Sequence, residues 1–157
     1  GCTTLVRLLD EETPGGSTTT AGVAFDGGSS GPLLTEDLAQ LPSPQAAAEY
    51  VRAVRDALQD CDTVTLDLGD GDEVEMSVAE ISAPELGDSR VGVRFTSDDP
   101  EYELEADQVL VASGSVLLVT SGIAALPEDV EGFTEQALDK LTGSTGDGSS
   151  GTSTQTA

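Results

Sequence analysis

The spacing of apolar residues along the chain changes from a helical period to a strand period and back again. The clearest helical stretch follows Leu41–Pro44, where apolar residues recur every three or four positions while charged and polar residues occupy the other side. This pattern predicts an amphipathic helix. Its inward positions are Ala48, Val51, Val54, Leu58 and Cys61.

Two further segments share this period, one near each end of the chain. Residues 3–12 carry an apolar cluster (Leu5, Val6, Leu8 and Leu9) and stop before Pro14. Residues 127–141 carry an apolar stripe behind Glu128 and Asp129, which lie in the first turn, where the helix dipole favours acids. The sequence therefore predicts about three helices.

Between the helices the apolar residues alternate, as they do in strands with one face in the core. A hairpin is expected over residues 17–25 and 32–41, joined by a Gly/Ser-rich connection. A meander is expected over residues 64–68, 74–78, 91–95, 102–112 and 116–121. Segments 109–111 and 116–119 are continuously apolar, which is typical of central strands covered on both faces.

These elements predict a single α+β domain over residues 1–142, with a largely antiparallel sheet and about three helices packed against it. Residues 143–157 contain only Gly, Ser, Thr, Asp, Gln and Ala. Such a composition cannot bury enough apolar surface to order itself, so a disordered tail is predicted there.

The strongly negative net charge of the chain disfavours anionic binding partners. The chain has 30 acidic and 6 basic residues, a net charge of −24, so nucleic acid and anionic membrane surfaces would repel it. No apolar run is long enough to span a bilayer. The chain also has no histidine, which excludes Ser-His-Asp and Cys-His catalysis. We therefore expect a protein that is not an enzyme and that needs no cofactor or metal.

The two cysteines, Cys2 and Cys61, are 59 positions apart and form no C-x-x-C motif. A structural disulfide is one interpretation, and it would fasten the N-terminal segment to the end of the central helix. A lipidated Cys2 of a processed lipoprotein and two free buried thiols are the alternatives. The first residue is Gly rather than Met, so any targeting signal is expected to lie outside this sequence.

Several groups of charged residues are candidates for binding or catalytic sites. Asp67, Asp70, Asp72 and Glu73 crowd one turn but match no calcium-loop spacing, so a hairpin turn is favoured. Asp98, Asp99, Glu101, Glu103 and Glu105 are better explained as a solvated strand face. Nothing selects a pair of carboxylates for hydrolysis. Arg90 and Arg94 share one strand face and are weak candidates for binding an anionic ligand, although ion pairs with acidic neighbouring strands are favoured.

Five segments in this order resemble a known family, and together they span about residues 2–141. They are 31–34 leading into 46–61, then 86–94, 107–111, 116–119 and 133–141. The order, the spacing and the cysteine after the central helix are similar to those of PknH-type extracellular sensor domains of mycobacterial kinases and the related actinobacterial sensor-domain lipoproteins.

The resemblance implies a bent sheet with packed helices, a candidate cleft for an unidentified small ligand, and disulfides in place of a metal. The kinase sensor domains have two disulfides, whereas this chain has cysteines for one. Without a kinase or a membrane span, the stand-alone secreted or lipoprotein branch is favoured, with a lipid anchor outside this sequence as one option. We therefore expect a non-catalytic extracytoplasmic binding or sensing module whose partner is a small molecule or a cell-surface protein. The alternative is a structural or interaction domain of the cell surface with no small-molecule site.

Overall fold

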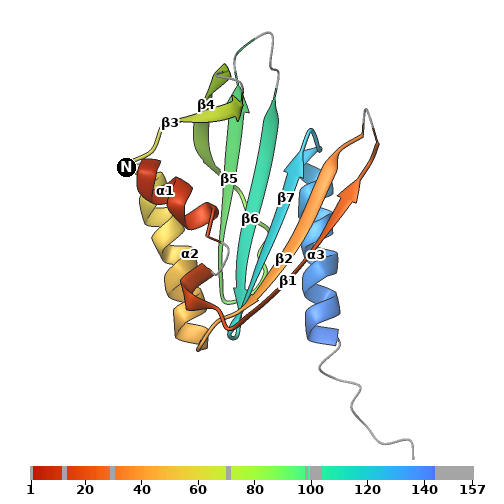
Figure 1. Ribbon diagram of the computed structural model, residues 1–157. Coiled ribbons are helices and arrows are strands. Elements are labelled where there is room, and N and C mark those ends of the chain that lie inside the picture. Colours follow the sequence, from red (N-terminus) through yellow and green to blue (C-terminus); the bar gives the residue numbers. More distant parts are fainter. Residues whose placement is uncertain are drawn as a thin grey trace, which may run out of the picture.

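The computed structural model describes residues 2–11, 14–28, 31–69, 72–97, 99 and 104–143 (Figure 1). Its helices are α1 (Cys2–Leu9), α2 (Pro44–Leu58) and α3 (Pro127–Gly143), and a short 3₁₀ turn, η1 (Pro14–Gly16), follows α1. The strands are β1 (Thr19–Asp26), β2 (Leu33–Gln40), β3 (Thr63–Gly69), β4 (Asp72–Ile81), β5 (Ser89–Ser97), β6 (Glu105–Ser113) and β7 (Val116–Ile123).

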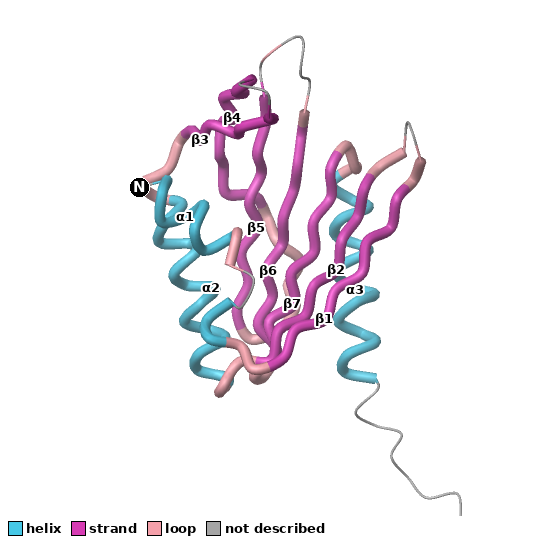
Figure 2. Tube along the Cα trace, viewed as in Figure 1, coloured by secondary structure: helices cyan, strands magenta, loops and turns pink. Residues whose placement is uncertain are grey.

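All the strands belong to one antiparallel sheet with the order β1-β2-β7-β6-β5-β4-β3. Strands β3 to β7 form the predicted meander, and the β1–β2 hairpin joins the sheet beside β7. Figure 2 shows this hairpin on the opposite side of the sheet from β3 and β4, and inclined to β5 and β6. The predicted α+β class, with a bent, largely antiparallel sheet in one domain, is confirmed.

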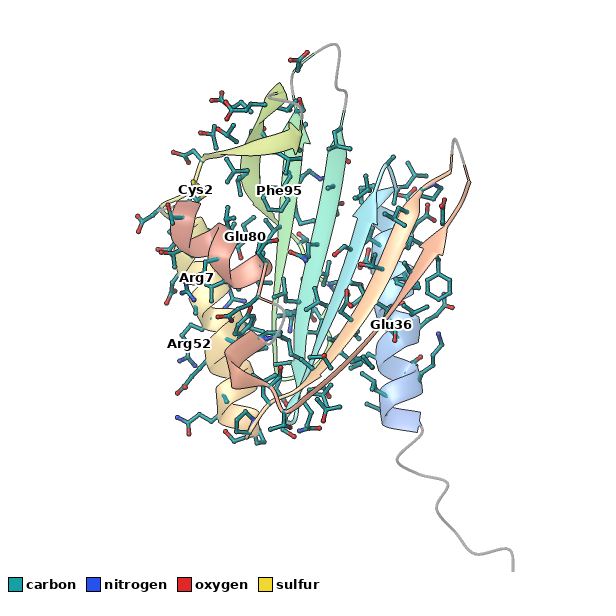
Figure 3. The ribbon with its side chains drawn as sticks, viewed as in Figure 1. Cys2, Arg7, Glu36, Arg52, Glu80 and Phe95 are labelled. Atoms are coloured by element: carbon teal, nitrogen blue, oxygen red, sulfur yellow. A yellow bond between two sulfur atoms is a disulfide. The ribbon has the colours of Figure 1, made fainter. Side chains whose placement is uncertain are left out.

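The N-terminus of the central helix α2 is fixed by local sequence signals. Ser43 caps its N-terminus, since its hydroxyl accepts a hydrogen bond from the Ala46 N–H at 3.1 Å, and Pro44 occupies the first turn, where no backbone donor is needed. Of the predicted inward residues of α2, Val51, Val54 and Leu58 are buried against the sheet. Ala48 is only half-buried, and its neighbours Ala47 and Tyr50 are buried instead. Figure 3 shows Arg52 on the outer side of α2.

The expected end of this helix was wrong by one turn. We expected Cys61 to be its last inward residue, but α2 ends at Leu58 and Cys61 follows a turn. The Asp60 N–H donates to the Ala57 carbonyl at 3.4 Å, and the Cys61 N–H donates to the Leu58 carbonyl at 3.2 Å. These three-residue hydrogen bonds tighten the helix end and carry Cys61 away from the helical path while leaving it buried.

Other boundaries also moved. Helix α1 ends at Leu9, three residues before the predicted end, and the first described residue of the predicted 102–112 strand segment is Leu104, with β6 beginning at Glu105. Helix α3 continues to Gly143, the first residue of the predicted tail. The rest of that tail, residues 144–157, lies outside the described residues. None of the helices in the described part of the chain is long and apolar enough to cross a membrane.

Helices cover both faces of the sheet. We call the two faces the α2 face, which α1 and α2 cover, and the α3 face, which α3 covers (Figure 1). The larger core lies under α1 and α2 and includes Val51, Val54, Val93, Leu110 and Leu117. The smaller core lies under α3 and includes Val109, Val111, Leu118, Val130 and Ala137. Strands β6 and β7 contribute to both cores, as predicted for central strands.

The absence of a side chain at Gly122 lets α3 approach β7. A Cβ atom at this position would collide with the side chain of Val130 and would lie 2.9 Å from the Cβ of Ala125. Beside this contact, the hydroxyls of Thr120 on β7 and Thr134 on α3 lie 2.6 Å apart and are fully buried. The hydrogen bond between them satisfies two polar groups inside an apolar interface.

Candidate functional site

A cleft opens on the α2 face, where the sheet extends beyond the cover provided by α1 and α2. It consists of two adjoining cavities, which we call the inner cavity, of about 310 Å³, and the outer cavity, of about 340 Å³. Leu9 of α1 and Gln108 of β6 line both of them. The two cavities therefore lie next to each other along the sheet, with Leu9 and Gln108 where they meet.

The inner cavity lies between α1, η1, α2 and the β1–β2 hairpin. Leu8, Leu9 and Tyr50 form one wall, and Leu110 and Val119 form the apolar floor. The polar side chains at this cavity are those of Glu11, Thr20, Asp37 and Gln108. Glu11 forms an ion pair with Arg7 at 3.3 Å, which partly compensates its charge. Gly22 on β1 has no side chain, and that leaves room for the carboxylate of Asp37 opposite it.

Tyr50 fixes the wall rather than offering a reactive group. Its hydroxyl donates a hydrogen bond to the backbone carbonyl of Leu8, so it ties α2 to α1. Burial, together with the negative charge of Glu11, raises the pKa of Tyr50 to about 12, and the charge of Arg7 opposes this shift. The phenol therefore stays protonated at physiological pH.

The outer cavity is more apolar and more open to solvent. Its walls come from α1, β3, β4, β5, β6 and β7, and they include Val6, Met76 and Phe95. Leu66 and Ile123 also line it, with 43% and 37% of their surface exposed. Figure 3 shows Phe95 on β5 beside α1. Large apolar side chains that remain partly exposed around a hollow are typical of a surface that binds an apolar group.

Gln108 joins the two cavities and is the polar group at the centre of the cleft. Its amide nitrogen donates to the Ser121 hydroxyl on β7 at 3.2 Å, which holds the side chain across two strands. Its strand neighbours on the same face are Ala106 and Leu110, so it is a polar residue in an apolar row. That interruption was visible in the sequence, and our sequence analysis missed it. Glu11, Asp37 and Leu9 carried no such signal.

The cysteines form a disulfide, as the first of the three interpretations expected. The Cα atoms of Cys2 and Cys61 lie 4.6 Å apart, and the bond joins the start of α1 to the segment after α2. It therefore anchors the helix that carries Leu8 and Leu9 at the wall of the cleft. In this state Cys2 has no free sulfur for a lipid.

Arg90 and Arg94 lie away from the cleft, and they line two different cavities. Arg90 pairs with Glu85 at 3.1 Å. Arg94 forms two hydrogen bonds to Asp107, at 2.7 and 2.6 Å, and lies 3.4 Å from Glu105. The hydrogen bonds to Asp107 raise the pKa of the Arg94 guanidinium still further. The pairs of Arg94 with β6 are the ion pairs between strands that the pattern favoured, whereas the partner of Arg90 lies in the connection between β4 and β5. An anion-binding role for either arginine stays a prediction.

The acidic clusters fall largely outside the described residues. This holds for the side chains of Asp67, Asp70 and Asp72 in the candidate calcium turn, while Glu73 is exposed on β4. It also holds for Asp98, Glu101 and Glu103 of the second cluster. In the part of the chain that the structure describes, no group of three or more His, Cys, Asp or Glu residues could hold a metal.

Asp107 is the one buried carboxylate among the described residues, with 3% of its surface exposed, and its partner is an arginine rather than a second acid. Two facing buried carboxyls, the arrangement that a carboxylate hydrolase would need, are therefore not found in the described part of the chain. The cleft on the α2 face has apolar walls and a few polar groups, a lining that is common in small-molecule sites.

Comparison with solved structures finds an extracellular domain with the same fold. The crystal structure of the extracellular domain of PknH from Mycobacterium tuberculosis superimposes with a TM-score of 0.67 at 16% sequence identity. The match covers 82% of this chain and 66% of that domain, just under two thirds of its length. The predicted resemblance to a PknH-type sensor domain is thus confirmed at the level of the fold. No family model and no curated protein sequence matches the chain.

Proposed function

We propose that this chain is a non-catalytic, extracytoplasmic ligand-binding or sensing module, and that its ligand occupies the cleft on the α2 face. The observation that carries this proposal is that the inner and outer cavities adjoin at Leu9 and Gln108. The fold that it shares with a kinase extracellular domain supports the sensing role by analogy. The disulfide supports an oxidising compartment outside the cytosol.

The lining of the cleft suggests the chemistry of the ligand. The apolar lining of the two adjoining cavities fits an extended apolar body, which would gain about 25 cal/mol for each Å² that it removes from water. Among the described lining residues there are three carboxylates, Asp10, Glu11 and Asp37, and no Lys or Arg. A ligand with a cationic or uncharged polar head fits these groups, whereas an anionic head would be repelled by them and by the net charge of −24. Gln108 would hydrogen-bond a polar group near the middle of the ligand.

The alternative was a structural or interaction domain with a solid core and no small-molecule site. Two cavities of about 300 Å³ or more that open side by side on one face favour the ligand-binding hypothesis over this alternative. The size is in the range of small-molecule sites when the two are taken as one depression.

Native mass spectrometry of non-reduced protein, secreted from an exporting bacterial host, tests the proposal. We expect a retained small molecule on the natural chain. Ala106→Phe should abolish this retention, because Ala106 lines the outer cavity and a phenyl ring there would fill it. Ala79→Phe is the matched control, since Ala79 is exposed on β4 and faces the other side of the sheet. Retention that is equal in both variants, or absent from the natural chain, would contradict the proposal.

A further inference from the structure

Strand β1 is an unprotected edge of the sheet. All eight of its residues are exposed, and within the described part of the chain its one strand neighbour is β2. The eight pairs with β2 run from Thr19↔Gln40 to Asp26↔Leu33 without a register shift. The strand is therefore long and regular along its free side, and it presents a row of backbone groups that can pair with another strand.

Apart from the charge of Asp26 at its end, β1 has none of the usual protections of an edge strand. It contains no lysine, no proline and no bulge. At the other edge of the sheet, α1 packs against β3. The exposed side chains of Val23 and Phe25 make β1 apolar on the α3 face, where Phe25 also stacks edge-on against Phe133 of α3, with ring centroids 5.4 Å apart.

The free backbone groups of β1 can be assigned from its hydrogen bonding. The Gly27 N–H donates to the Pro32 carbonyl at 2.9 Å, so Gly27 faces β2 in a hydrogen-bonded pair. Because such pairs alternate along an antiparallel ladder, the odd-numbered residues of β1 bond to β2. The N–H and C=O groups of Thr20, Gly22, Ala24 and Asp26 then point outward from the edge.

The charge pattern of this segment indicates what kind of partner it fits. No charged residue occurs from Pro14 to Phe25, although 30 of the 157 residues of the chain are acidic. A basic partner would gain from acids at its contact surface, so an acid-free edge offers it no advantage. A partner that carries the same negative charge requires such a surface, because like charges placed directly opposite each other on paired strands are destabilising.

We propose that β1 pairs with β1 of a second copy of this chain, antiparallel about a twofold axis, and extends the sheet across both copies. In a pairing centred on Val23, Asp26 lies opposite Thr20 of the other copy, so no carboxylate faces another. The nearest acids of β2, such as Glu36, would be three strand spacings from their counterparts, roughly 14 Å at about 4.8 Å a spacing. That exceeds the Debye length of about 8 Å at physiological salt.

The twofold axis of such a pair stands perpendicular to the sheet. Both copies therefore turn the same face of the sheet in the same direction, and their two clefts open on one side of the dimer. The exposed side chains of Val23 and Phe25 gather on the opposite side, around the axis. Ligand binding and dimerisation would use different surfaces.

Sedimentation velocity of the full chain tests this pairing over a range of protein concentrations and at about 0.05 M and about 1 M salt. We expect the mass to rise with concentration from 16.0 kDa toward twice that value. Dimerisation should be stronger at high salt, because salt screens the repulsion between two highly negative copies. A contact that depends on salt bridges would weaken instead.

Ala24→Pro tests the edge itself, because it removes an outward N–H and leaves the ladder with β2 in place. Each dimer contains the change twice, so we expect dimerisation to weaken at least about tenfold. Ala24→Ser keeps the N–H and is the matched control, and the circular dichroism spectrum of both variants shows that the sheet has formed.

A chain that stays monomeric under all these conditions would overturn the proposal. So would a dimer that Ala24→Pro leaves unchanged, since the contact would then lie elsewhere. Protection of the β1 amides from hydrogen exchange by an alternating Lys/Val peptide, in a monomeric chain, would instead assign the edge to a basic peptide partner. Slower exchange of the Gly22 and Ala24 amides as protein concentration rises is the result that supports self-pairing.

Discussion

Removal of the disulfide should cost this domain a large share of its stability and should loosen one wall of the cleft. The Cys2–Cys61 bond closes a loop with a sequence separation of 59. On the chain-entropy relation, a loop of this length lowers the entropy of the unfolded chain by about 14 cal/mol/K, or about 4 kcal/mol at 25 °C. Total stabilities of single domains are typically about 5 to 15 kcal/mol.

Helix α1 should feel this loss most. It has eight residues, whereas isolated helices shorter than about 12 residues are marginal in water, so tertiary contacts and the disulfide must hold it. Its buried residues, Leu5 and Leu8, supply the remaining anchorage. Without the bond, α1 is expected to open locally before the sheet unfolds, and the wall formed by Leu8 and Leu9 would open with it.

The assay is urea unfolding of the Cys2→Ser/Cys61→Ser double variant, followed by circular dichroism, with hydrogen exchange of the α1 amides beside it. We expect the free energy of unfolding to fall by about 4 kcal/mol and the α1 amides to exchange faster. Reduction of the natural chain should have the same effect, and Thr4→Ser, an exposed change on α1, should have almost none. A loss below about 1 kcal/mol, or unchanged exchange in α1, would refute the reasoning.

Three further results are expected, each from equilibrium unfolding. Gly122→Ala should destabilise the domain by about 1–3 kcal/mol because the added Cβ atom collides with α3. Gly132→Ala is the control, since it lies in open space on α3 and should stabilise the domain by up to about 1 kcal/mol. An increase in stability from Gly122→Ala would contradict the close packing of α3 on β7. Arg94→Met should lower the free energy of unfolding by about 3–5 kcal/mol because it leaves the charge of Asp107 buried without its partner. Asp107→Asn removes that charge and should therefore cost less than Arg94→Met does. Equal losses of stability in the two variants would show that the buried charge is not the cause. The pKa of Tyr50 is raised from 10.0 to about 12 in the folded chain, so the stability that the protonated phenol contributes is complete below pH 10 and is lost as the pH rises toward 12. Tyr50→Phe should therefore make the free energy of unfolding fall less steeply over this pH range. An identical pH profile of stability in the variant would contradict the burial of the phenol.

The periodic pattern predicted the elements well because local spacing decides them. The alternation in residues 91–95 and the helical spacing from Val51 to Leu58 both correspond to buried faces in the structure. The end of α2 was misplaced because Cys61 continues the apolar spacing even though the backbone has already left the helix. The spacing of apolar residues shows which residues are buried, but it does not show whether the backbone at those residues is still helical.

The cleft was beyond prediction from the residues because it depends on pairings between distant parts of the chain. Strand β2 joins β7, with Leu38 opposite Leu118, and nothing local in either segment specifies that partner. This pairing brings Asp37 near Gln108 and the α1 wall. In the same way, the sequence placed Arg94 on a charged strand face, but only the register of β5 with β6 sets Asp107 opposite it. The resemblance to a sensor-domain family supplied what periodicity could not, namely the expectation of a cleft.

The most direct test of the central claim is an NMR titration of the ¹⁵N-labelled, non-reduced chain with dodecyltrimethylammonium, at concentrations below micelle formation, compared with dodecyl sulfate. The proposed cleft predicts saturable shifts for the cationic amphiphile at Leu9, Ala106, Gln108 and Ile123, with much weaker binding of the anionic one. Shifts that gather on the α3 face, or equal binding of both amphiphiles, would contradict it.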